Sequence, residues 1–253
     1  MSHPFLSCAS IVPHWPAPAH VKALMTTRQG GPSQAPFDAF NVGDHVGDDP
    51  AVVAGCRQQL SAQAGGTRFH WLKQVHGTAV VSAEAVAAGC EADAITSHTV
   101  GEGCVVMTAD CLPVLLCDRQ GKQIAAVHAG WRGLNGGVLE ATVARMPIPS
   151  GELMAWLGPA IGPCCFEVGA EVRDAFVARQ PQAAAAFTSS VNSLRGDRFM
   201  ANLYLLARLR LEAVGVANLY GGGACTCCDR TRFYSYRRDG ARTGRMAAAI
   251  WLG

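Results

Sequence analysis

The stretch that decides the fold is VVMTADCLPVLLCDRQGKQIAAVHAGWRG, residues 105–133. It contains two apolar runs, at 112–117 and 124–127, separated by a polar turn at 118–122. Short apolar runs bounded by turn residues are typical of the buried strands of a hairpin. Cys111 opens the first run and His128 closes the second, so in an antiparallel pair both side chains reach the same edge of the sheet. A thiolate beside an imidazole suits zinc or makes an activated nucleophile.

Length and composition set the broad class. We expect a single α/β (α+β) domain over residues 1–253, with an irregular extension at 1–20, because strands and helices alternate without a linker. The 21 basic and 19 acidic residues nearly balance, which argues against a nucleic-acid partner. No uncharged apolar run is long enough to span a membrane, and the N-terminus lacks the basic region of a secretory signal. We therefore expect a cytoplasmic protein, with a monomer favoured.

Eleven cysteines are many for a chain with no export signal. In a reducing compartment most of them are expected to be buried thiols, with a minority serving as ligands or nucleophiles. Cys225, Cys227 and Cys228 lie close together in sequence, and Cys164-Cys165 could complete a second metal site. Vicinal cysteines are awkward chelators, so we favour thiols that shape the structure or a ligand site.

Turn residues and apolar periodicity predict the other elements. Residues 29–50 form the longest polar loop, and the following helix at about 50–64 has Asp48 or Asp49 as its N-cap and Pro50 at its first position. His76 lies at a turn between two predicted strands. The predicted strands are 21–27, 69–75, 78–82 and 153–157, the predicted helices are 134–146, 169–179 and 201–214, and 233–238 with 246–252 is predicted to form a closing hairpin.

His76, Cys111 and His128 are candidate metal ligands at the ends of strands. They are 35 and 17 residues apart (76 to 111, 111 to 128), whereas the paired ligands of zinc fingers are two to five residues apart. The spacing fits a catalytic zinc site with three protein ligands and an open fourth position. The alternative is three unrelated buried polar residues, and spacing alone does not exclude it.

Several ordered motifs are shared with a known family. TTRQGG (26–31), NVGDHVGDD (41–49), KQVHG (73–77), ADAIT (92–96), TADCLPVLL (108–116), VHAGWRG (127–133), GPAIGPCCFEVG (158–169) and FYSYRRDGARTGR (233–245) resemble the YfiH-like family. That family has been labelled polyphenol oxidase or laccase, peptidoglycan editing factor, and purine nucleoside phosphorylase. The resemblance implies a layered sandwich of sheets and helices, similar also to the catalytic domain of cytotoxic necrotizing factor.

The resemblance also implies a metal and an activity. The family's zinc ligands correspond to His76, Cys111 and His128, and its substrates are purine nucleosides and phosphate. Phosphorolysis of adenosine, inosine and methylthioadenosine is implied, together with deamination of adenosine, in which zinc activates water at a pKa near ~7. For phosphate we consider Arg28 first and Arg57 second. Asn41 and His45 are candidates to orient ribose or phosphate, and Gln74 and Arg132 are further candidate substrate-binding residues. Asp110 is a candidate base or orienting group for the metal ligands.

Two other interpretations remain open, whereas a copper-dependent polyphenol oxidase is disfavoured. A multicopper oxidase needs many imidazoles, largely in His-x-His pairs, whereas this chain has eight histidines and no such pair. We therefore consider copper an adventitious or alternative metal. A cysteine- or zinc-dependent amide hydrolase that edits muropeptide precursors would use Cys111 as nucleophile and His128 as base, or the metal. A non-catalytic metal or redox sensor would use the many thiols.

Overall fold

The computed structural model describes residues 8–191 and 196–253, so the first seven residues of the predicted N-terminal extension lie outside the described residues. Its strands are β1 Ser10–Ile11, β2 Val21–Thr26, β3 Arg68–His70, β4 Val80–Ser82, β5 Ala94–Ser97, β6 Glu102–Thr108, β7 Leu112–Asp118, β8 Ile124–Ala129, β9 Leu153–Leu157, β10 Glu167–Gly169, β11 Phe187–Ser189, β12 Arg198–Ala201, β13 Asn218–Gly221 and β14 Met246–Leu252. Its α-helices are α1 Pro50–Gln63, α2 Trp131–Gly136, α3 Val138–Arg145, α4 Ala170–Arg179, α5 Leu203–Ala213 and α6 Tyr236–Asp239. Two 3₁₀ helices lie at Ser150–Glu152 and Pro181–Ala186.

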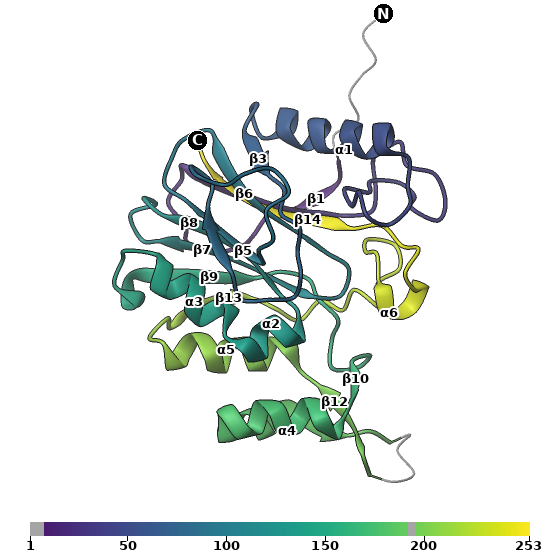
Figure 1. Ribbon diagram of the computed structural model, residues 1–253, viewed down its shortest axis with the longest axis vertical. Coiled ribbons are helices and arrows are strands. Elements are labelled where there is room, and N and C mark those ends of the chain that lie inside the picture. The colour runs from purple at the N-terminus through teal and green to yellow at the C-terminus, as the bar shows by residue number, and fades with distance from the viewer. Residues whose placement is uncertain (1–7, 192–195) are drawn as a thin grey trace, which may run out of the picture.

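Two sheets packed face to face form the centre of the molecule (Figure 1). The five-stranded sheet has the order β1-β2-β14-β6-β3, and the six-stranded sheet has the order β13-β9-β7-β8-β5-β4. Helix α1 covers the outer face of the first sheet, and α3 and α5 cover the outer face of the second. The predicted α/β (α+β) sandwich of sheets and helices is confirmed.

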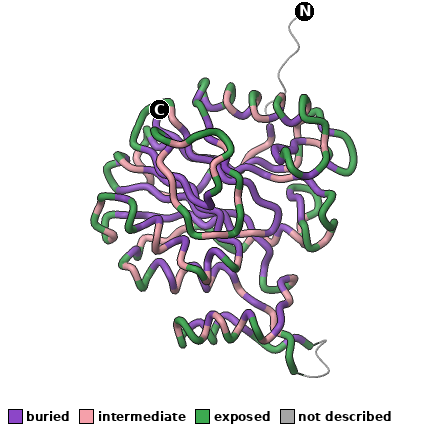
Figure 2. Tube along the Cα trace, viewed as in Figure 1, coloured by how far each residue is buried: buried purple, intermediate pink, exposed green. Residues whose placement is uncertain are grey.

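Buried apolar side chains fill the space between the two sheets and the spaces between each sheet and the helices that cover it (Figure 2). Every residue of β7, β8 and β14 is buried, because each of these strands has neighbouring layers on both of its faces. Strands buried on both faces have nearly continuous apolar sequences instead of alternating ones. Burial of each large apolar side chain contributes about 1.5–3 kcal/mol, so this central hairpin is a rigid support for the residues at its ends.

The predicted hairpin is confirmed, and its register explains why its ends meet. Strands β7 and β8 pair antiparallel, with Leu112 opposite Ala129 and Pro113 opposite His128. The strand at β9 and the helix α1 are also confirmed, with the Asp49 side chain accepting a hydrogen bond of 2.8 Å from the backbone N–H of Ala51. Helices α4 and α5 lie within two residues of their predicted limits.

Three predicted elements, two strands near His76 and one helix near Gly137, differ from the structure. The strands predicted at 69–75 and 78–82 are shorter, and they belong to different sheets: β3 pairs with β6 and β4 with β5. The Gln74 side chain bonds both backbone groups of Met107, which substitutes for strand pairing beyond β3. The helix predicted at 134–146 begins at Trp131 and is divided at Gly137, whose φ of 105° is left-handed and favours glycine.

The predicted closing hairpin is wrong in its first half. Residues 236–239 form the helical turn α6, whose N-cap Ser235 accepts a hydrogen bond from the backbone N–H of Arg238. Strand β14 is as predicted, but it pairs with β2 and β6 instead. Two features were not predicted from the sequence. One is the small sheet β10-β12-β11, and the other is β1, which lies inside the predicted irregular extension and pairs with β2. None of the helices in the described part of the chain is long and apolar enough to cross a membrane.

Candidate metal centre

Three chain segments bring His76, Cys111 and His128 together. Cys111 immediately precedes β7, His128 lies near the end of β8, and His76 lies in the loop that passes from the five-stranded to the six-stranded sheet. Their candidate ligand atoms all lie within 4.8 Å of one another. Cys111 Sγ is 3.7 Å from His76 Nε2, and the two imidazole rings are nearly perpendicular with centroids 4.8 Å apart. Two imidazoles and one thiol could therefore hold a metal at this edge.

Asp93 hydrogen-bonds the His128 ring and the backbone of the loop that carries His76. It is fully buried just before β5, and its Oδ1 lies 2.8 Å from Nδ1 of His128, which leaves Nε2 of that ring for a metal. The same carboxylate accepts hydrogen bonds from the backbone N–H groups of Val75, His76 and Gly77 at 3.2, 3.0 and 2.6 Å. A carboxylate behind a histidine fixes the tautomer and the ring orientation of a metal ligand.

The charges of these groups depend on one another. Burial raises the pKa of the Cys111 thiol, but the imidazoles of His128 and His76 outweigh this and lower that pKa to about 6. Burial lowers the pKa of His128, whereas Cys111 and Asp93 raise it to about 9. Burial also opposes ionisation of Asp93, but His128 and the N–H of Gly77 hold its pKa below the usual value. A thiolate at neutral pH can act either as a metal ligand or as a nucleophile.

Asp110 is held by the C-terminal segment and not by the ligands. Its carboxylate accepts hydrogen bonds from Thr226 Oγ1 at 2.6 Å, Ser235 Oγ at 3.0 Å and the backbone N–H of Arg237 at 2.7 Å. Its φ is 89°, and that of His76 is 60°, both unusual for residues other than glycine. Such backbone strain persists where surrounding contacts fix it, often at functional sites. The carboxylate of Asp110, next to Cys111, is therefore already occupied by three donors.

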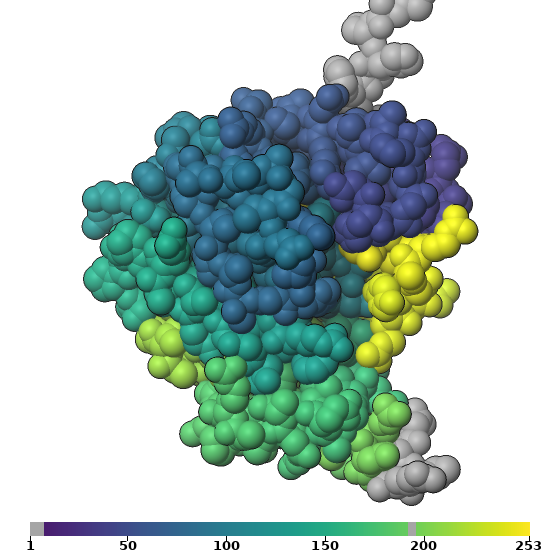
Figure 3. All heavy atoms as spheres, in the orientation of Figure 1, coloured from purple at the N-terminus to yellow at the C-terminus, as the bar shows by residue number. Residues whose placement is uncertain are grey.

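A cavity of about 1290 Å³ opens onto the three candidate ligands. Figure 3 shows this hollow between the blue segments and the yellow C-terminal segment. Trp71, Trp131 and Phe166 contribute aromatic surface to its wall. Its basic side chains are Arg57, Arg68, Lys73, Arg132, Arg237 and Arg245. This combination suits a ligand that has a flat apolar part and an anionic part.

Four of the other candidate residues line the cavity, whereas two do not. His45, Arg57, Gln74 and Arg132 lie in its wall, although the Gln74 amide is engaged with Met107. Arg28 and Asn41 are not among the lining residues. Arg28 donates to the backbone oxygens of Asp38 and Arg230 and lies over the Tyr234 ring. Asn41 is fully buried, and its side chain bonds Gly43, Asp48 and Arg245.

Sequence reasoning did not single out Asp93 or Gly130 as functional, and it considered Arg245 only as one of four arginines, with Arg237, Arg238 and Arg242, that could hold an anion or lie at a solvated hairpin tip. The signal for Asp93 was a lone carboxylate within the apolar stretch 92–95, because a buried carboxylate must be paired. Gly130 lies against the ligands, since a Cβ there would be 2.9 Å from Cδ2 of His76 and 3.0 Å from Sγ of Cys111. No sequence pattern distinguished Arg245 from the neighbouring arginines of the C-terminal segment.

The comparison with protein families agrees with the resemblance seen in the motifs. The family described as multi-copper polyphenol oxidoreductase laccase matches residues 22–253, and relatives bearing the name YfiH match 96% of the chain. The chain belongs to this YfiH-like family. The match covers all three candidate ligands and the whole cavity wall.

Individual relatives of this YfiH-like chain are similar over nearly their full length. A Pseudomonas aeruginosa protein named purine nucleoside phosphorylase is 55% identical over 96% of this chain and 98% of its own. An Escherichia coli protein, purine nucleoside phosphorylase YfiH, is 50% identical over the same shares. The crystal structure of NMB0706 from Neisseria meningitidis has a TM-score of 0.91 at 52% identity, covering 96% of this chain and 98% of that one.

Replacing Gly130 by alanine is expected to disturb the ligands without unfolding the protein. The φ of Gly130 is −61°, which alanine adopts readily, but its Cβ would press on His76 and Cys111. We expect the zinc affinity, measured by competition with a chromophoric chelator, to fall about 10-fold or more, as for changes around other metal ligands. Gly151→Ala is the control, because its Cβ meets nothing within 4 Å. Equal affinities in the two variants would contradict this packing argument.

Proposed function

We propose that this chain is a zinc-dependent purine nucleoside enzyme. It would catalyse the phosphorolysis of adenosine, inosine and methylthioadenosine, and the deamination of adenosine to inosine. The single observation that carries the proposal is the group of three ligands facing a cavity with both aromatic and basic walls. The names of the relatives from Pseudomonas aeruginosa and Escherichia coli support the choice of nucleosides.

The donor atoms fit zinc better than a copper cluster. Two imidazoles and a thiolate are a ligand set of catalytic zinc sites, in which the fourth position stays open. The chain has eight histidines in all and no His-x-His pair, too few to hold the multicopper cluster that the family's description implies. Zinc, when bound, would supply a Lewis acid beside the cavity. His128 would bind through Nε2, since its Nδ1 is engaged with Asp93.

We assign the phosphate of the reaction to Arg245. Its Nη1 donates to the backbone oxygens of Thr243 and Gly244 at 2.8 and 3.0 Å, which fixes the guanidinium at the cavity wall. Burial lowers its pKa, and the charges of Cys111 and Asp110 act on it in the opposite direction. None of the carboxylates in the described residues forms an ion pair with this half-buried arginine. A fixed guanidinium without a carboxylate partner favours an incoming anion.

The aromatic wall would hold the purine. A guanidinium lies over each tryptophan ring. Cζ of Arg57 is 4.2 Å from the ring centroid of Trp71, and Cζ of Arg132 is 4.5 Å from that of Trp131. Flat apolar surfaces of this kind bury an aromatic base, while the guanidinium groups and His45 bond ribose and phosphate oxygens. Excluding water from such a pocket strengthens every charge interaction with the reacting atoms.

Arg245→Met is expected to separate the two reactions. It removes a phosphate donor, so the KM for phosphate should rise and phosphorolysis should fall by about 10²-fold, the usual loss for one electrostatic donor. Deamination needs no phosphate and should fall much less. Steady-state rates with inosine plus phosphate and with adenosine alone measure both effects. Arg119→Ala, a change at an exposed arginine bonded to Asn218, is the control.

The same experiment compares Arg245 with Arg28. The sequence-based assignment predicts that Arg28→Ala has the phosphate-specific loss. Its contacts with Asp38, Arg230 and Tyr234 instead lead us to expect a loss of stability in Arg28→Ala. A phosphate-specific defect in Arg28→Ala but not in Arg245→Met would reverse our assignment.

Amide hydrolysis is the second candidate function. His128 lies between Asp93 and Cys111, the order in which an orienting carboxylate, a base and a thiol nucleophile are arranged in cysteine hydrolases. The Cys111 thiolate would attack the amide carbonyl of a muropeptide precursor, the amine would leave with a proton from His128, and water would then hydrolyse the thioester on Cys111. This candidate predicts a metal-free enzyme that loses activity on alkylation of Cys111.

Product analysis tests the proposed function. The purified protein is incubated with adenosine or inosine, with and without phosphate, and the products are separated by chromatography. Phosphorolysis predicts adenine or hypoxanthine together with ribose 1-phosphate only when phosphate is present, and deamination predicts inosine from adenosine in either condition. Unchanged nucleosides in every reaction of zinc-loaded protein would contradict the proposal and favour amide hydrolysis.

A further inference from the structure

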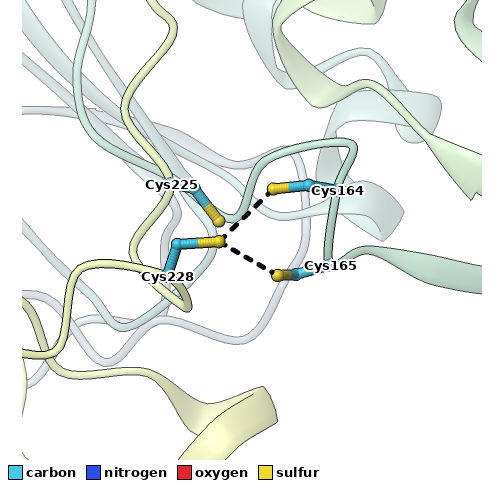
Figure 4. A group of neighbouring side chains, drawn as sticks. All are labelled: Cys164, Cys165, Cys225 and Cys228. Carbon is cyan, nitrogen blue, oxygen red and sulfur yellow. Dashed lines mark hydrogen bonds between the residues drawn. The ribbon is translucent and has the colours of Figure 1, made fainter.

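A second group of sulfur atoms lies outside the cavity wall. Cys164 and Cys165 come from the turn after β9, and Cys225 and Cys228 from the turn after β13 (Figure 4). Their four sulfur atoms lie within 4.8 Å of one another. Sγ of Cys228 is 3.5 Å from that of Cys164 and 3.4 Å from that of Cys165. The structure thus brings Cys228 into contact with cysteines that are 64 and 63 residues away in sequence.

The local backbone aims both pairs at the same point. The N–H groups of Cys165 and Phe166 both bond the carbonyl of Gly162 at 3.0 Å, which turns the vicinal cysteines toward the second segment. The N–H of Gly162 donates to Sγ of Cys225 at 3.2 Å. A Cβ on Gly162 would lie 3.0 Å from Cβ of Cys225 and 3.3 Å from Sγ of Cys164, so glycine permits this close approach.

We propose that Cys164, Cys165, Cys225 and Cys228 bind one zinc ion in a closed structural site. Four thiolates in a compact cluster are the donor set of tetrahedral zinc, and Cys225 and Cys228 have the C-x-x-C spacing of structural zinc pairs. With zinc–sulfur bonds of about 2.3 Å, a regular tetrahedron has sulfur atoms roughly 3.8 Å apart, close to the separations seen here. The N–H of Gly162 is a typical donor to a metal-bound thiolate.

A disulfide accounts less well for the same cluster. The two sulfur–sulfur contacts of Cys228 are equivalent within 0.1 Å (3.5 against 3.4 Å), so neither partner is selected over the other. A single disulfide would also leave two thiols of the cluster unused. All four cysteines are free in the structure.

This zinc ion would fasten the two segments that hold Asp110. On one side the N–H of Ile161 donates to the carbonyl of Asp110 at 2.9 Å. On the other, Thr226 bonds the Asp110 carboxylate at 2.6 Å, and its N–H bonds the carbonyl of Ala160 at 3.0 Å. The cluster therefore acts on Cys111 as a positioning element through Asp110, and its metal takes no part in the reaction.

Zinc content tests the second site independently of the first. The full chain with His76→Ala and His128→Ala lacks two ligands of the candidate metal centre, so its bound zinc reports on the four cysteines. After reduction, chelation and reloading with Zn²⁺, we expect one zinc per chain by elemental mass spectrometry. Adding Cys225→Ser or Cys228→Ser should abolish this binding, whereas adding Cys90→Ser, a half-buried cysteine outside the cluster, should preserve it.

Alkylation of the wild-type protein gives a second readout that needs no variant to fold. Cys164 and Cys228 are exposed, so iodoacetamide should modify them in reduced, zinc-free protein and much more slowly after Zn²⁺ is added. Peptide mass spectrometry locates the modified positions. Alkylation of these cysteines at the same rate with and without Zn²⁺, or zinc content unaffected by Cys225→Ser, would overturn the proposal. Neither outcome depends on nucleoside turnover.

Discussion

Cys111→Ser is expected to remove both the zinc of the candidate metal centre and the nucleoside phosphorolysis. A serine hydroxyl keeps its proton at neutral pH, whereas the neighbouring imidazoles lower the pKa of the Cys111 thiol to about 6. The variant thus loses the one anionic ligand of the group. We expect turnover to fall by roughly 10³-fold or more, at least the loss known for one strong electrostatic contact. Zinc content and kcat/KM for inosine, measured on one preparation, check this.

Cys90→Ser provides the matched control for that experiment, because Cys90 is also half-buried but lies in none of the candidate metal groups. It should keep both zinc and activity. A Cys111→Ser protein that holds the wild-type amount of zinc but has no turnover would instead support Cys111 as a covalent nucleophile, and with it the amide hydrolase.

Asp93→Ala is expected to have the largest effect on stability among changes near the site. It removes the acceptor of three backbone N–H groups and of the His128 ring at once, within a fully buried position. Breaking such a buried network costs about 3–5 kcal/mol. The His76 loop and the His128 ring would also lose their orientation, so zinc affinity should fall about 10–100-fold. Urea unfolding and chelator competition measure the two effects separately.

Asp118→Ala separates stability from function. Asp118 is a second buried carboxylate, at the far end of β7, and it accepts hydrogen bonds from the N–H groups of Gln120, Lys122 and Gln123. Its removal should lower the free energy of unfolding as well, yet leave zinc affinity and turnover close to those of the wild type. Equal zinc affinities in the Asp93→Ala and Asp118→Ala variants would contradict the role of Asp93.

The fold was predictable where local sequence and tertiary packing agree. The central hairpin and α1 follow from apolar runs with clear turn and capping residues. Residues 69–75 and 78–82 were both predicted as neighbouring strands. In the structure β3 pairs with β6 and β4 with β5, in different sheets, and the sequence does not reveal which sheet a strand joins. Residues 236–239 form a helical turn because Ser235 caps it and Asp110 bonds Arg237, a contact across 127 positions.

The candidate site was predictable only as far as its residue types are distinctive. His76, Cys111 and His128 come from the resemblance, since their spacing alone left open three unrelated polar residues. Arg28 was assigned to phosphate because it opens the longest loop, but its side chain is engaged with Asp38 and Arg230 outside the cavity wall. Arg245 is distinguished by its surroundings: two carbonyl contacts and its place in the wall beside Cys111. These surroundings exist only after folding.

The most direct test of the central claim is a crystal structure of zinc-loaded protein soaked with inosine, with anomalous diffraction recorded at the zinc absorption edge. We predict an anomalous peak for a zinc ion bonded to His76, Cys111 and His128, with zinc–sulfur distances of about 2.3 Å and zinc–nitrogen distances of about 2.0–2.1 Å. The nucleoside should lie in the adjoining cavity, against Trp71 or Trp131. No zinc between these three side chains, with the side chains pointing apart, would contradict the claim.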